Sequence, residues 1–243
     1  MFDLTGKKAL VTGSSQGIGK SLAKCLAAHG AEVFVHASSS LDKAKRAAAE
    51  MTGDGECVGA NLAKPDEVES LYRQTGDVDI LVLNASVQFR NPWDKVTTDE
   101  IETQLQVNFK ASYRLIQLYE PHMKEAGFGR IVTVGSVQQH KPHKDMPIYA
   151  ASKCAVMSLV TNLAKQFAPY GITVNNMSPG VIATPRNADA LADAEYCAKV
   201  MQGIPMGFAG AENDCDGAVL LLCSAEGRYI TGIDLVVDGG MSL

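Results

Sequence analysis

The sequence predicts an α/β fold built on a doubly wound parallel sheet of about seven strands, with helices on both faces. Seven short β-rich runs alternate with longer stretches of helical spacing from one end of the chain to the other. Several of the runs are almost wholly apolar, as in parallel strands that are covered on both faces. The runs span residues 7–12, 32–36, 56–60, 79–83, 130–135, 172–177 and 233–237.

Two of the intervening stretches carry clear helix boundaries. Apolar residues at helical spacing predict a helix from Ile18 to Gly30, where a glycine suits the left-handed residue that ends a helix. A second predicted helix runs from Ile148 to about Ala168, and Pro169 ends it. These helices connect predicted strands, as a parallel sheet requires.

The composition predicts a cytoplasmic globular protein. The 22 Lys and Arg residues against 27 Asp and Glu residues give a net charge of −5, which offers no basic footprint for nucleic acid. No apolar run approaches the roughly 20 residues of a membrane span. The six cysteines lack CxxC spacing, and no cluster has metal-ligand spacing, so we expect reduced thiols and no metal. Without a linker-like segment, we expect one catalytic domain over residues 1–243.

A glycine-rich segment, TGSSQGIG at 12–19, joins the first predicted strand to a helix. Three glycines allow a sharp turn, a close approach to a pyrophosphate and tight packing of helix on strand. The helix N-terminus adds free N–H groups and the positive end of a dipole. The spacing is GxxxGxG and not the general GxGxxG, so a glycine-rich turn without a ligand is the alternative interpretation.

Ser136, Tyr149 and Lys153 form a second group of candidate residues. Ser136 follows a predicted strand, at the edge where α/β sheets bind ligands. Tyr149 and Lys153 are four residues apart in a predicted helix and therefore share a face. A tyrosine titrates near about 10, and an adjacent ammonium favours its phenolate. The pattern predicts a tunable acid and base beside a hydroxyl, although a surface Tyr–Lys pair is the simpler alternative.

Considered together, the motifs are far more specific than any one alone. The sequence resembles the single-domain branch of the short-chain dehydrogenase/reductase family, which has a Rossmann-type fold. The resemblance implies hydride transfer between a nicotinamide cofactor, NAD or NADP, and the CH–OH group of a secondary alcohol or the matching ketone. The matching segments are residues 12–19, Asn84-Ala85, Asn108, 135–136, 149–153, 178–184 and 237–240.

The resemblance also implies roles for the candidate catalytic residues. Tyr149 would donate a proton in reduction and accept one in oxidation, and Lys153 would lower the Tyr149 pKa and hold the nicotinamide ribose. Ser136 would fix the substrate oxygen, and Asn108 would hold a water that links Lys153 to solvent. The implied cofactor contacts are Gly13, Ser15, Gln16, Gly17, Ile18, Gly19, Ser38, Ser39, Asn61, Asn84, Ala85, Tyr149, Lys153, Pro179, Gly180, Ile182 and Thr184.

The end of the second strand bears on which cofactor is used. Relatives selective for NAD generally carry a carboxylate there, whereas this chain has His36, Ala37 and then three serines. The missing carboxylate removes the main repulsion of a 2′-phosphate, and serines can donate to it. The sequence therefore favours NADP, with His36 as a further candidate contact. NAD stays open because the segment has no arginine, and Gln16 replaces the arginine of many NADP-preferring relatives.

The segment after Ser136 predicts a polar or anionic substrate. Residues 137–144 are polar and able to carry positive charge, as are Arg90 and Arg186 in other loops. We expect Gln138, His140 or Arg90 to contact substrate hydroxyls or a carboxylate. The sequences around these segments most resemble those of the sugar-acid and polyol dehydrogenases of the family, such as gluconate 5-dehydrogenase. A solvated surface loop is the alternative interpretation.

Two other functions stay open at this stage. A 3-oxoacyl-carrier-protein reductase-like enzyme has the same core motifs, and Lys141 and Lys144 could face its acidic carrier protein. A non-catalytic nucleotide sensor is disfavoured because this chain keeps all four candidate catalytic residues. The resemblance further implies a homotetramer, and residues 185–210 are expected to form a lid over the substrate. The sequence names neither the physiological substrate nor the reaction direction.

Overall fold

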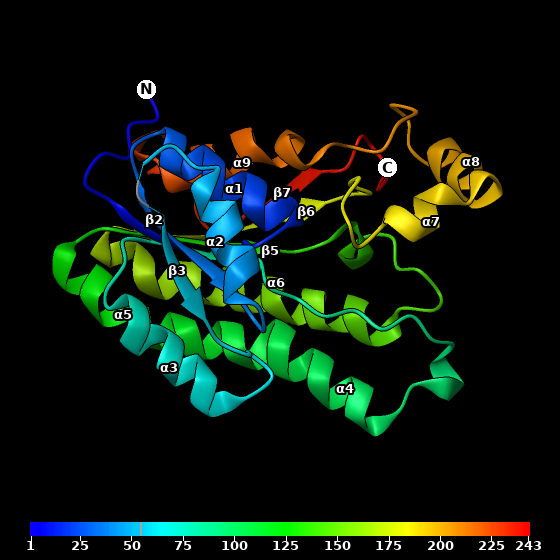
Figure 1. The fold of residues 1–243 in the computed structure, drawn as a ribbon, viewed down its shortest axis with the longest axis horizontal. Helices are drawn as coiled ribbons and strands as arrows, with labels where there is room; N and C mark the ends of the chain where they lie inside the picture. Colours follow the sequence, from blue (N-terminus) through cyan, green and yellow to red (C-terminus); the bar gives the residue numbers. More distant parts are fainter. Residues whose placement is uncertain (54) are drawn as a thin grey trace.

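The computed structural model describes residues 1–53 and 55–243, and a seven-stranded parallel sheet runs through its centre (Figure 1). The strand order is β3-β2-β1-β4-β5-β6-β7, and every neighbouring pair is parallel. The expected fold class is confirmed, and each predicted run overlaps one strand. The strands are β1 (Lys8–Val11), β2 (Glu32–Ala37), β3 (Glu56–Gly59), β4 (Ile80–Leu83), β5 (Gly129–Val134), β6 (Ile172–Pro179) and β7 (Asp234–Val237).

Helices cover both faces of the sheet. In Figure 1, α1 and α9 lie above it, and α3 to α6 lie below it, while α2 packs against β2. Both helices that the sequence delimited are present, as α1 and α6. The helices are α1 (Gly17–Ala28), α2 (Leu41–Ala49), α3 (Pro65–Thr75), α4 (Thr98–Leu105), α5 (Ala111–Ala126), α6 (Pro147–Phe167), α7 (Ala188–Ala192), α8 (Ala194–Gln202) and α9 (Asp216–Cys223).

The apolar strands reflect a core on each side of the sheet. Leu10 of β1 packs into the cluster shared with α3, α5 and α6, whereas Ala9 and Val11 pack into the cluster shared with α1 and α9. All three side chains are fully buried. A polar residue on either face would lose its water without gaining a partner, which explains why the strand does not alternate. Truncating Leu10 to alanine would cost about 2–5 kcal/mol of unfolding free energy.

The order of the strands sets the place of the site. From β1 the chain adds β2 and β3 on one side of the sheet, and from β4 it adds β5, β6 and β7 on the other side, so the strand order reverses between β1 and β4. In open α/β sheets, ligands bind outside the carboxyl ends of the strands at such a point. The glycine-rich segment follows β1, Asn84 follows β4, and Ser136 follows β5. The predicted site residues therefore converge on one edge of the sheet.

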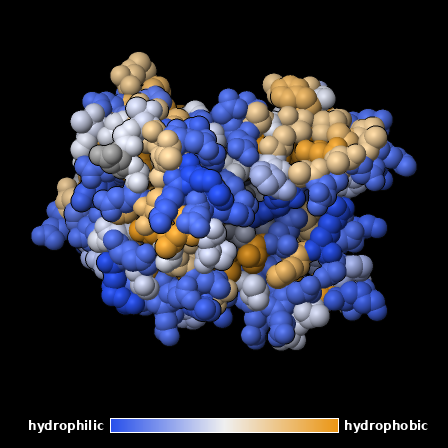
Figure 2. Space-filling view, viewed as in Figure 1, coloured by the Kyte–Doolittle hydropathy of each residue, from blue (hydrophilic) through white to orange (hydrophobic). Residues whose placement is uncertain are grey.

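The segment 185–210 stands apart from the two helical layers. Its helices α7 and α8 lie beyond the carboxyl edge of the sheet, at the right of Figure 1. The base of the segment is closed, since Ala183 N donates to Gly210 O (2.8 Å) and Gly210 N donates to Val181 O (3.0 Å). Figure 2 shows mostly hydrophobic colours on this lobe and hydrophilic ones beneath it. Among the described residues, no helix is long and apolar enough to cross a membrane.

Candidate active site

A cavity of about 1200 Å³ opens at the carboxyl ends of β1, β4, β5 and β6, and its wall includes α7 and α8. Of the residues predicted from the sequence, Ser39, Asn108 and His140 are not part of its wall. The predicted residues that line it are Gly13, Ser15, Gln16, Gly17, Ile18, Gly19, Ser38, Asn61, Asn84, Ala85, Arg90, Ser136, Gln138, Tyr149, Lys153, Pro179, Gly180, Ile182 and Thr184.

The nucleotide end of the cavity, defined as the turn from Gly13 to Gly19, is built from backbone. Gly13 and Gly17 adopt φ values of +66° and +61°, which disfavour a side chain. A Cβ on Gly19 would overlap Gly13 O and the Asn84 side-chain amide. That amide donates to Gly13 O (3.1 Å) and to Thr12 O (2.9 Å) and so fixes the turn. Gly13 and Gly17 therefore serve the sharp turn and Gly19 serves close packing, which are two of the three roles that the sequence predicted.

The N-terminus of α1 leaves donors for an anion. No side chain caps this helix, and its first turn contains no acidic residue. By contrast, α4 is closed by a capping box between Thr97 and Glu100. The first N–H groups of α1 and the positive end of its dipole therefore face the cavity, which suits the pyrophosphate of a dinucleotide. The residues present fit such a cofactor.

His36, the further candidate contact for a cofactor phosphate, lines the cavity, but both nitrogens of its ring already have partners. His36 is 1% exposed, and its Nδ1 accepts a hydrogen bond from Gly13 N (2.9 Å) while Nε2 lies 2.9 Å from Ala60 O. Nδ1 must be unprotonated to accept, so Nε2 carries the proton and the ring is neutral. Burial lowers the His36 pKa despite the opposing hydrogen bond to Ala60. The ring supports the glycine turn and carries no charge toward a phosphate.

Residues after β2 and β3 line the same end of the cavity. Ser38 and Ser39 lie in the bend that follows β2, and of the two only Ser38 lines the cavity. Asn61 follows β3, and its side-chain oxygen accepts from Ala63 N (3.0 Å). Its own N–H donates to Glu67 (2.6 Å), so this loop is held by bonds within itself.

Tyr149 and Lys153 lie in the first turns of α6 and are 5% and 3% exposed. The Lys153 ammonium donates to Val134 O at the end of β5 (2.6 Å) and lies 5.6 Å from the centre of the Tyr149 ring. Burial lowers the Lys153 pKa, and the Arg186 charge lowers it further, while Tyr149 opposes both effects. One helix face and one carbonyl therefore hold the ammonium beside the phenol.

The surroundings of Tyr149 favour its phenolate. Burial raises the Tyr149 pKa, but the charges of Lys153 and Arg186 and hydrogen bonds from Ser136 and Ser86 outweigh it, so that the pKa lies below its ordinary value. Positive charge beside a buried phenol is the arrangement that acid–base work near neutral pH requires. Chemically, the group can give or take a proton inside the cavity.

Ser136 is held by hydrogen bonds to Gln138 and Gln139, which follow it closely in the chain. Its Oγ accepts from Gln138 N (3.2 Å), which opens the short 3₁₀ turn Val137–Gln139, and its N–H donates to Gln139 Oε1 (3.1 Å). Since Oγ accepts in this contact, its proton is left to be donated into the cavity. The hydroxyl proton is free to be donated, and Ser136 lies within hydrogen-bond reach of Tyr149.

Asn108 does not reach the cavity, although the sequence predicted it as part of the catalytic group. It lies in one π-helical turn, Gln106–Lys110, between α4 and α5, and is 2% exposed. Its side chain exchanges hydrogen bonds with the backbone of Val87 (2.9 and 3.0 Å) and donates to Ser152 (3.1 Å). The side-chain amide therefore joins the loop after β4 to α6, and the predicted role of Asn108 in holding a water stays a prediction.

The substrate end of the cavity, defined as the wall formed by residues 86–90, 136–146 and 185–200, is lined by long polar side chains. Arg90 donates to His143 Nε2 (3.0 Å), and its guanidinium lies 5.2 Å from the centre of the Tyr196 ring. Gln138 lines the wall, but its oxygen accepts from His143 N (2.6 Å). Burial lowers the His143 pKa, and the charges of Arg90 and Lys144 lower it further.

Arg186 and Ser86 form a contact that the sequence did not single out as a site. Arg186 donates to both Ser86 Oγ (3.0 Å) and Ser86 O (2.7 Å), and both residues line the cavity. What the sequence lacked was the pairing, since the two residues are 100 positions apart.

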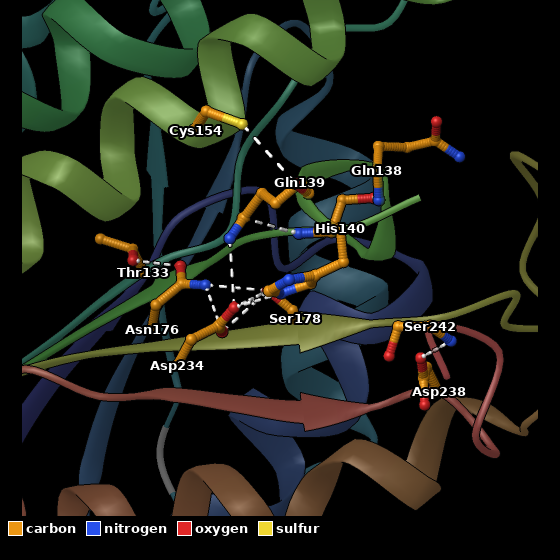
Figure 3. A network of polar contacts seen from close by, with 11 residues as sticks. Thr133, Gln138, Gln139, His140, Cys154, Asn176, Ser178, Asp234, Asp238 and Ser242 are labelled. Atoms are coloured by element: carbon orange, nitrogen blue, oxygen red, sulfur yellow. Dashed lines mark hydrogen bonds and ion pairs between the residues drawn. The ribbon is translucent and has the colours of Figure 1, made fainter. Parts of the chain in front are cut away.

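The expectation that His140 contacts substrate is wrong. Its Nε2 lies 2.8 Å from Asp234 Oδ2 on β7, and the residue is not part of the cavity wall. The reason is the 3₁₀ turn after Ser136, which rotates His140 toward β7 and leaves Gln138 and His143 on the cavity side. Figure 3 shows His140 aligned with Asp234.

The chain is similar along nearly its whole length to known proteins. A family model described as enoyl-(acyl carrier protein) reductase matches residues 13–242. The chain is 35% identical over 249 residues to 3beta-hydroxysteroid dehydrogenase 1 of Eggerthella lenta, covering 99% of this chain and 95% of that protein. It is 36% identical over 245 residues to a 3-oxoacyl-[acyl-carrier-protein] reductase of Haemophilus influenzae, covering 99% of this chain and all of that protein.

Solved structures agree with this result. A gluconate 5-dehydrogenase of Burkholderia cenocepacia, in complex with NADP and tartrate, superimposes with a TM-score of 0.92 at 31% identity, covering 99% of this chain and 97% of the other. The matched family model spans the glycine turn, the Tyr149 segment and the C-terminal strand. The chain is an oxidoreductase that acts on hydroxyl or keto groups, and it belongs to the short-chain dehydrogenase/reductase family.

Proposed function

We propose that this protein is an NADP-dependent dehydrogenase that interconverts a secondary alcohol and a ketone on a sugar acid or a related polyol. The observation that carries the proposal is one cavity that joins two unlike ends. Tyr149, Lys153 and Ser136 lie beside its glycine-built nucleotide end, and Arg90, Lys144 and Arg186 line its substrate end. Such a cavity suits a small polar substrate that is anionic at one end.

NADP is the proposed cofactor. The turn after β2 presents Ser38 and no carboxylate to the cavity, so a 2′-phosphate meets donors without repulsion. The related gluconate 5-dehydrogenase of Burkholderia cenocepacia is described with NADP bound. When bound, the nicotinamide of this cofactor supplies or accepts the hydride. The α1 N-terminus would hold its pyrophosphate, and Pro179, Gly180, Ile182 and Thr184 would line the nicotinamide.

The proposed acid and base is Tyr149. In oxidation its phenolate takes the proton of the substrate hydroxyl, and in reduction its phenol returns a proton to the forming alkoxide. Lys153 keeps the phenolate accessible through its charge, while Ser136 donates to the same substrate oxygen and fixes its place. Positioning of one C–O unit against these groups supplies much of the rate.

The preference for an anionic substrate rests on charge. Arg90, Lys144 and Arg186 are exposed to the cavity, and no acidic side chain other than Asp145 is among its described lining residues. A carboxylate about 4 Å from one such cation gains several kcal/mol at an effective dielectric of 20, before desolvation costs. The Burkholderia cenocepacia relative is described in complex with tartrate, a small hydroxy acid.

The alternative of a 3-oxoacyl-carrier-protein reductase-like enzyme is not favoured. Its acidic carrier protein would need a basic surface patch, and the two candidate lysines do not form one. Lys141 donates to Met241 O near the C-terminus (2.9 Å), whereas Lys144 faces into the cavity. Identity near 35% to enzymes of unlike substrates does not choose between them.

Three further features belong to the proposal. We take residues 1–243 as one catalytic domain in which 185–210 is a lid, because the ends of that segment meet at Val181, Ala183 and Gly210. Its two helices bury none of their residues, so opening would cost little packing energy. A homotetramer and a cytoplasmic location, both expected from the sequence, remain predictions.

A matched substrate panel tests the function. Initial rates with gluconate, sorbitol, a simple secondary alcohol and an acyl thioester ketone would be measured with NADP and NAD in both directions. We expect the highest kcat/KM with a sugar acid and NADP, and we expect Arg90→Gln to raise KM for the acid about tenfold while sparing sorbitol. A preference for the thioester, or for NAD, would contradict the corresponding part of the proposal.

A further inference from the structure

A network of polar side chains centred on Asp234 joins β6, β7 and the turn that follows Ser136 (Figure 3). Its centre is the Asp234 carboxylate at the start of β7, which accepts from Asn176 (2.7 Å), Ser178 (2.8 Å) and Gln139 (3.2 Å). His140 adds a contact from the exposed side (2.8 Å). Asn176 and Ser178 are fully buried, so the network is part of the interior.

Gln139 joins this network to Ser136. Its Nε2 donates to Asp234, and its Oε1 accepts from Ser136 N (3.1 Å). A carboxylate can only accept, so Asp234 determines which end of the Gln139 amide faces it. The amide oxygen is thereby directed at the Ser136 N–H. With Asp234 neutralised, the amide would be free to turn and to present its NH₂ group to that N–H.

The side chains that link Asp234 to Ser136 occupy the space where Gly135 would otherwise have a side chain. A Cβ on Gly135 would overlap Gln139 Oε1 and Asn176 Nδ2, and it would lie 2.7 Å from Ser178 Oγ. Gly135 is not in the left-handed region, so backbone conformation does not demand a glycine here. The need comes from the three polar side chains that pass beside it on the way to Ser136.

We propose that Asp234, acting through Gln139, is a positioning residue for Ser136 in the reaction. Ser136 is held at two points: its N–H by Gln139 and its Oγ by Gln138 N. The first of these depends on Asp234, which lies 98 positions further along the chain on the edge strand of the sheet. The inference rests on the proposed function, because it requires that Ser136 orients the substrate oxygen.

A charge exchange tests the connection. Gln139→Glu places a carboxylate against Asp234, and we expect kcat to fall about tenfold as the two repel and Ser136 shifts. Adding Asp234→Asn restores the pairing in reverse, since the new amide can donate to the introduced carboxylate while that carboxylate still accepts from Ser136 N. The double variant is expected to recover kcat to within about threefold of the starting protein. Affinity for NADPH, followed by fluorescence, should not change in either.

A second cycle separates positioning from a general structural role. In a Ser136→Ala background, Gln139→Glu should lower kcat less than twofold, because the group it positions is gone. An equal loss with and without Ser136, or an undiminished kcat in Gln139→Glu, would overturn the inference. If thermal unfolding shows that Gln139→Glu is not folded, Asp234→Asn replaces it in the same comparison with and without Ser136. Asp79→Asn, which neutralises an acceptor for Lys8 N at the opposite end of the sheet, is the matched control.

The same experiment distinguishes this inference from the proposed function. Ser136→Ala alone should lower kcat at least a hundredfold. If Ser136→Ala keeps full turnover, the proposed mechanism fails whatever Asp234 does. If it lowers turnover as expected while Gln139→Glu adds its full cost on top, only the role of Asp234 is overturned.

Discussion

The nucleotide end and the substrate end of the cavity are built in different ways. The nucleotide end consists of glycines, a bare helix terminus and short side chains that bond within a few residues or to the adjacent strand. The substrate end consists of long side chains tied in pairs across the sequence. Arg90 and His143 are 53 residues apart, and Arg186 and Ser86 are 100 apart.

The difference teaches where this protein can change. Backbone geometry at the nucleotide end tolerates few substitutions, because a Cβ on Gly13 or Gly19 meets main-chain atoms and the positive φ of Gly17 disfavours a side chain. At the substrate end Arg90 and Arg186 are exposed and their partners His143 and Ser86 are only partly buried, so these side chains can be exchanged without disturbing the core. Substrate preference can therefore shift while cofactor binding stays fixed.

The largest expected effect lies where the two ends meet. Tyr149→Phe removes the proton that both directions of the reaction need and keeps the shape of the ring. We expect kcat to fall by about 10²–10⁴-fold, with NADPH affinity within twofold of the unchanged protein. Initial rates and a fluorescence titration measure the two quantities. Tyr113→Phe, on an exposed face of α5, is the control and should change neither. A Tyr149→Phe variant with near-full turnover would refute the mechanism.

Gly19→Ala tests whether the nucleotide end is as rigid as its backbone suggests. The added methyl group would overlap Gly13 O and the Asn84 amide, so we expect at least a tenfold weaker NADPH affinity and a lower melting temperature. Gly217→Ala is the matched helical control in α9, because a Cβ there meets nothing within 4 Å. It should stabilise the protein by about 0.4–1 kcal/mol. Equal NADPH affinities and melting temperatures of the two variants would show that the nucleotide end is not rigid.

The two ends also differ in how well the sequence predicted them. The glycine turn and the Tyr149–Lys153 pair could each be predicted because their geometry is local, a turn and one face of a helix. That they share one site was implied by the family resemblance. The placement of His140 was wrong because a 3₁₀ turn in a loop decides its direction.

Long-range pairing explains the remaining differences. The Arg186–Ser86 contact and the use of His36 as a neutral support depend on segments that only the fold brings together. Asn108 was placed in the catalytic group, yet its amide donates to Val87 and Ser152. The fold class, by contrast, follows from strand runs that are each visible within a few residues.

Ser38→Asp tests whether the side chain of Ser38 lies beside the 2′-phosphate of the proposed cofactor. A carboxylate at this position would face the proposed 2′-phosphate and repel it, so we expect kcat/KM with NADPH to fall roughly tenfold and that with NADH to hold or rise. Ser39→Asp is the control, since Ser39 is outside the cavity wall. Steady-state kinetics with both cofactors would decide. An equal loss for NADH and NADPH would mean that the phosphate does not bind there.

The smallest expected effect is a shift in pH dependence at the substrate end. Arg186 is one of the charges that hold the Tyr149 pKa below its ordinary value, so Arg186→Gln should raise that pKa. Oxidation needs the phenolate and gains rate as pH rises through the Tyr149 pKa, whereas reduction needs the phenol and loses rate over the same range. Both midpoints should therefore move to higher pH, with a change below about tenfold at any fixed pH.

Arg73→Gln is the control for this shift, because Arg73 lies on the outer helix α3 and is exposed there. Rate profiles of kcat/KM between pH 5 and 10 in both directions would be compared for the two variants, with a neutral polyol as substrate so that a lost carboxylate contact does not enter. A midpoint that stays in place, or moves to lower pH, would show that Arg186 does not act on Tyr149. Because Arg186 lies in the segment 185–210 that we propose as a lid, a confirmed shift would also support a link between closure of that segment and the protonation of Tyr149.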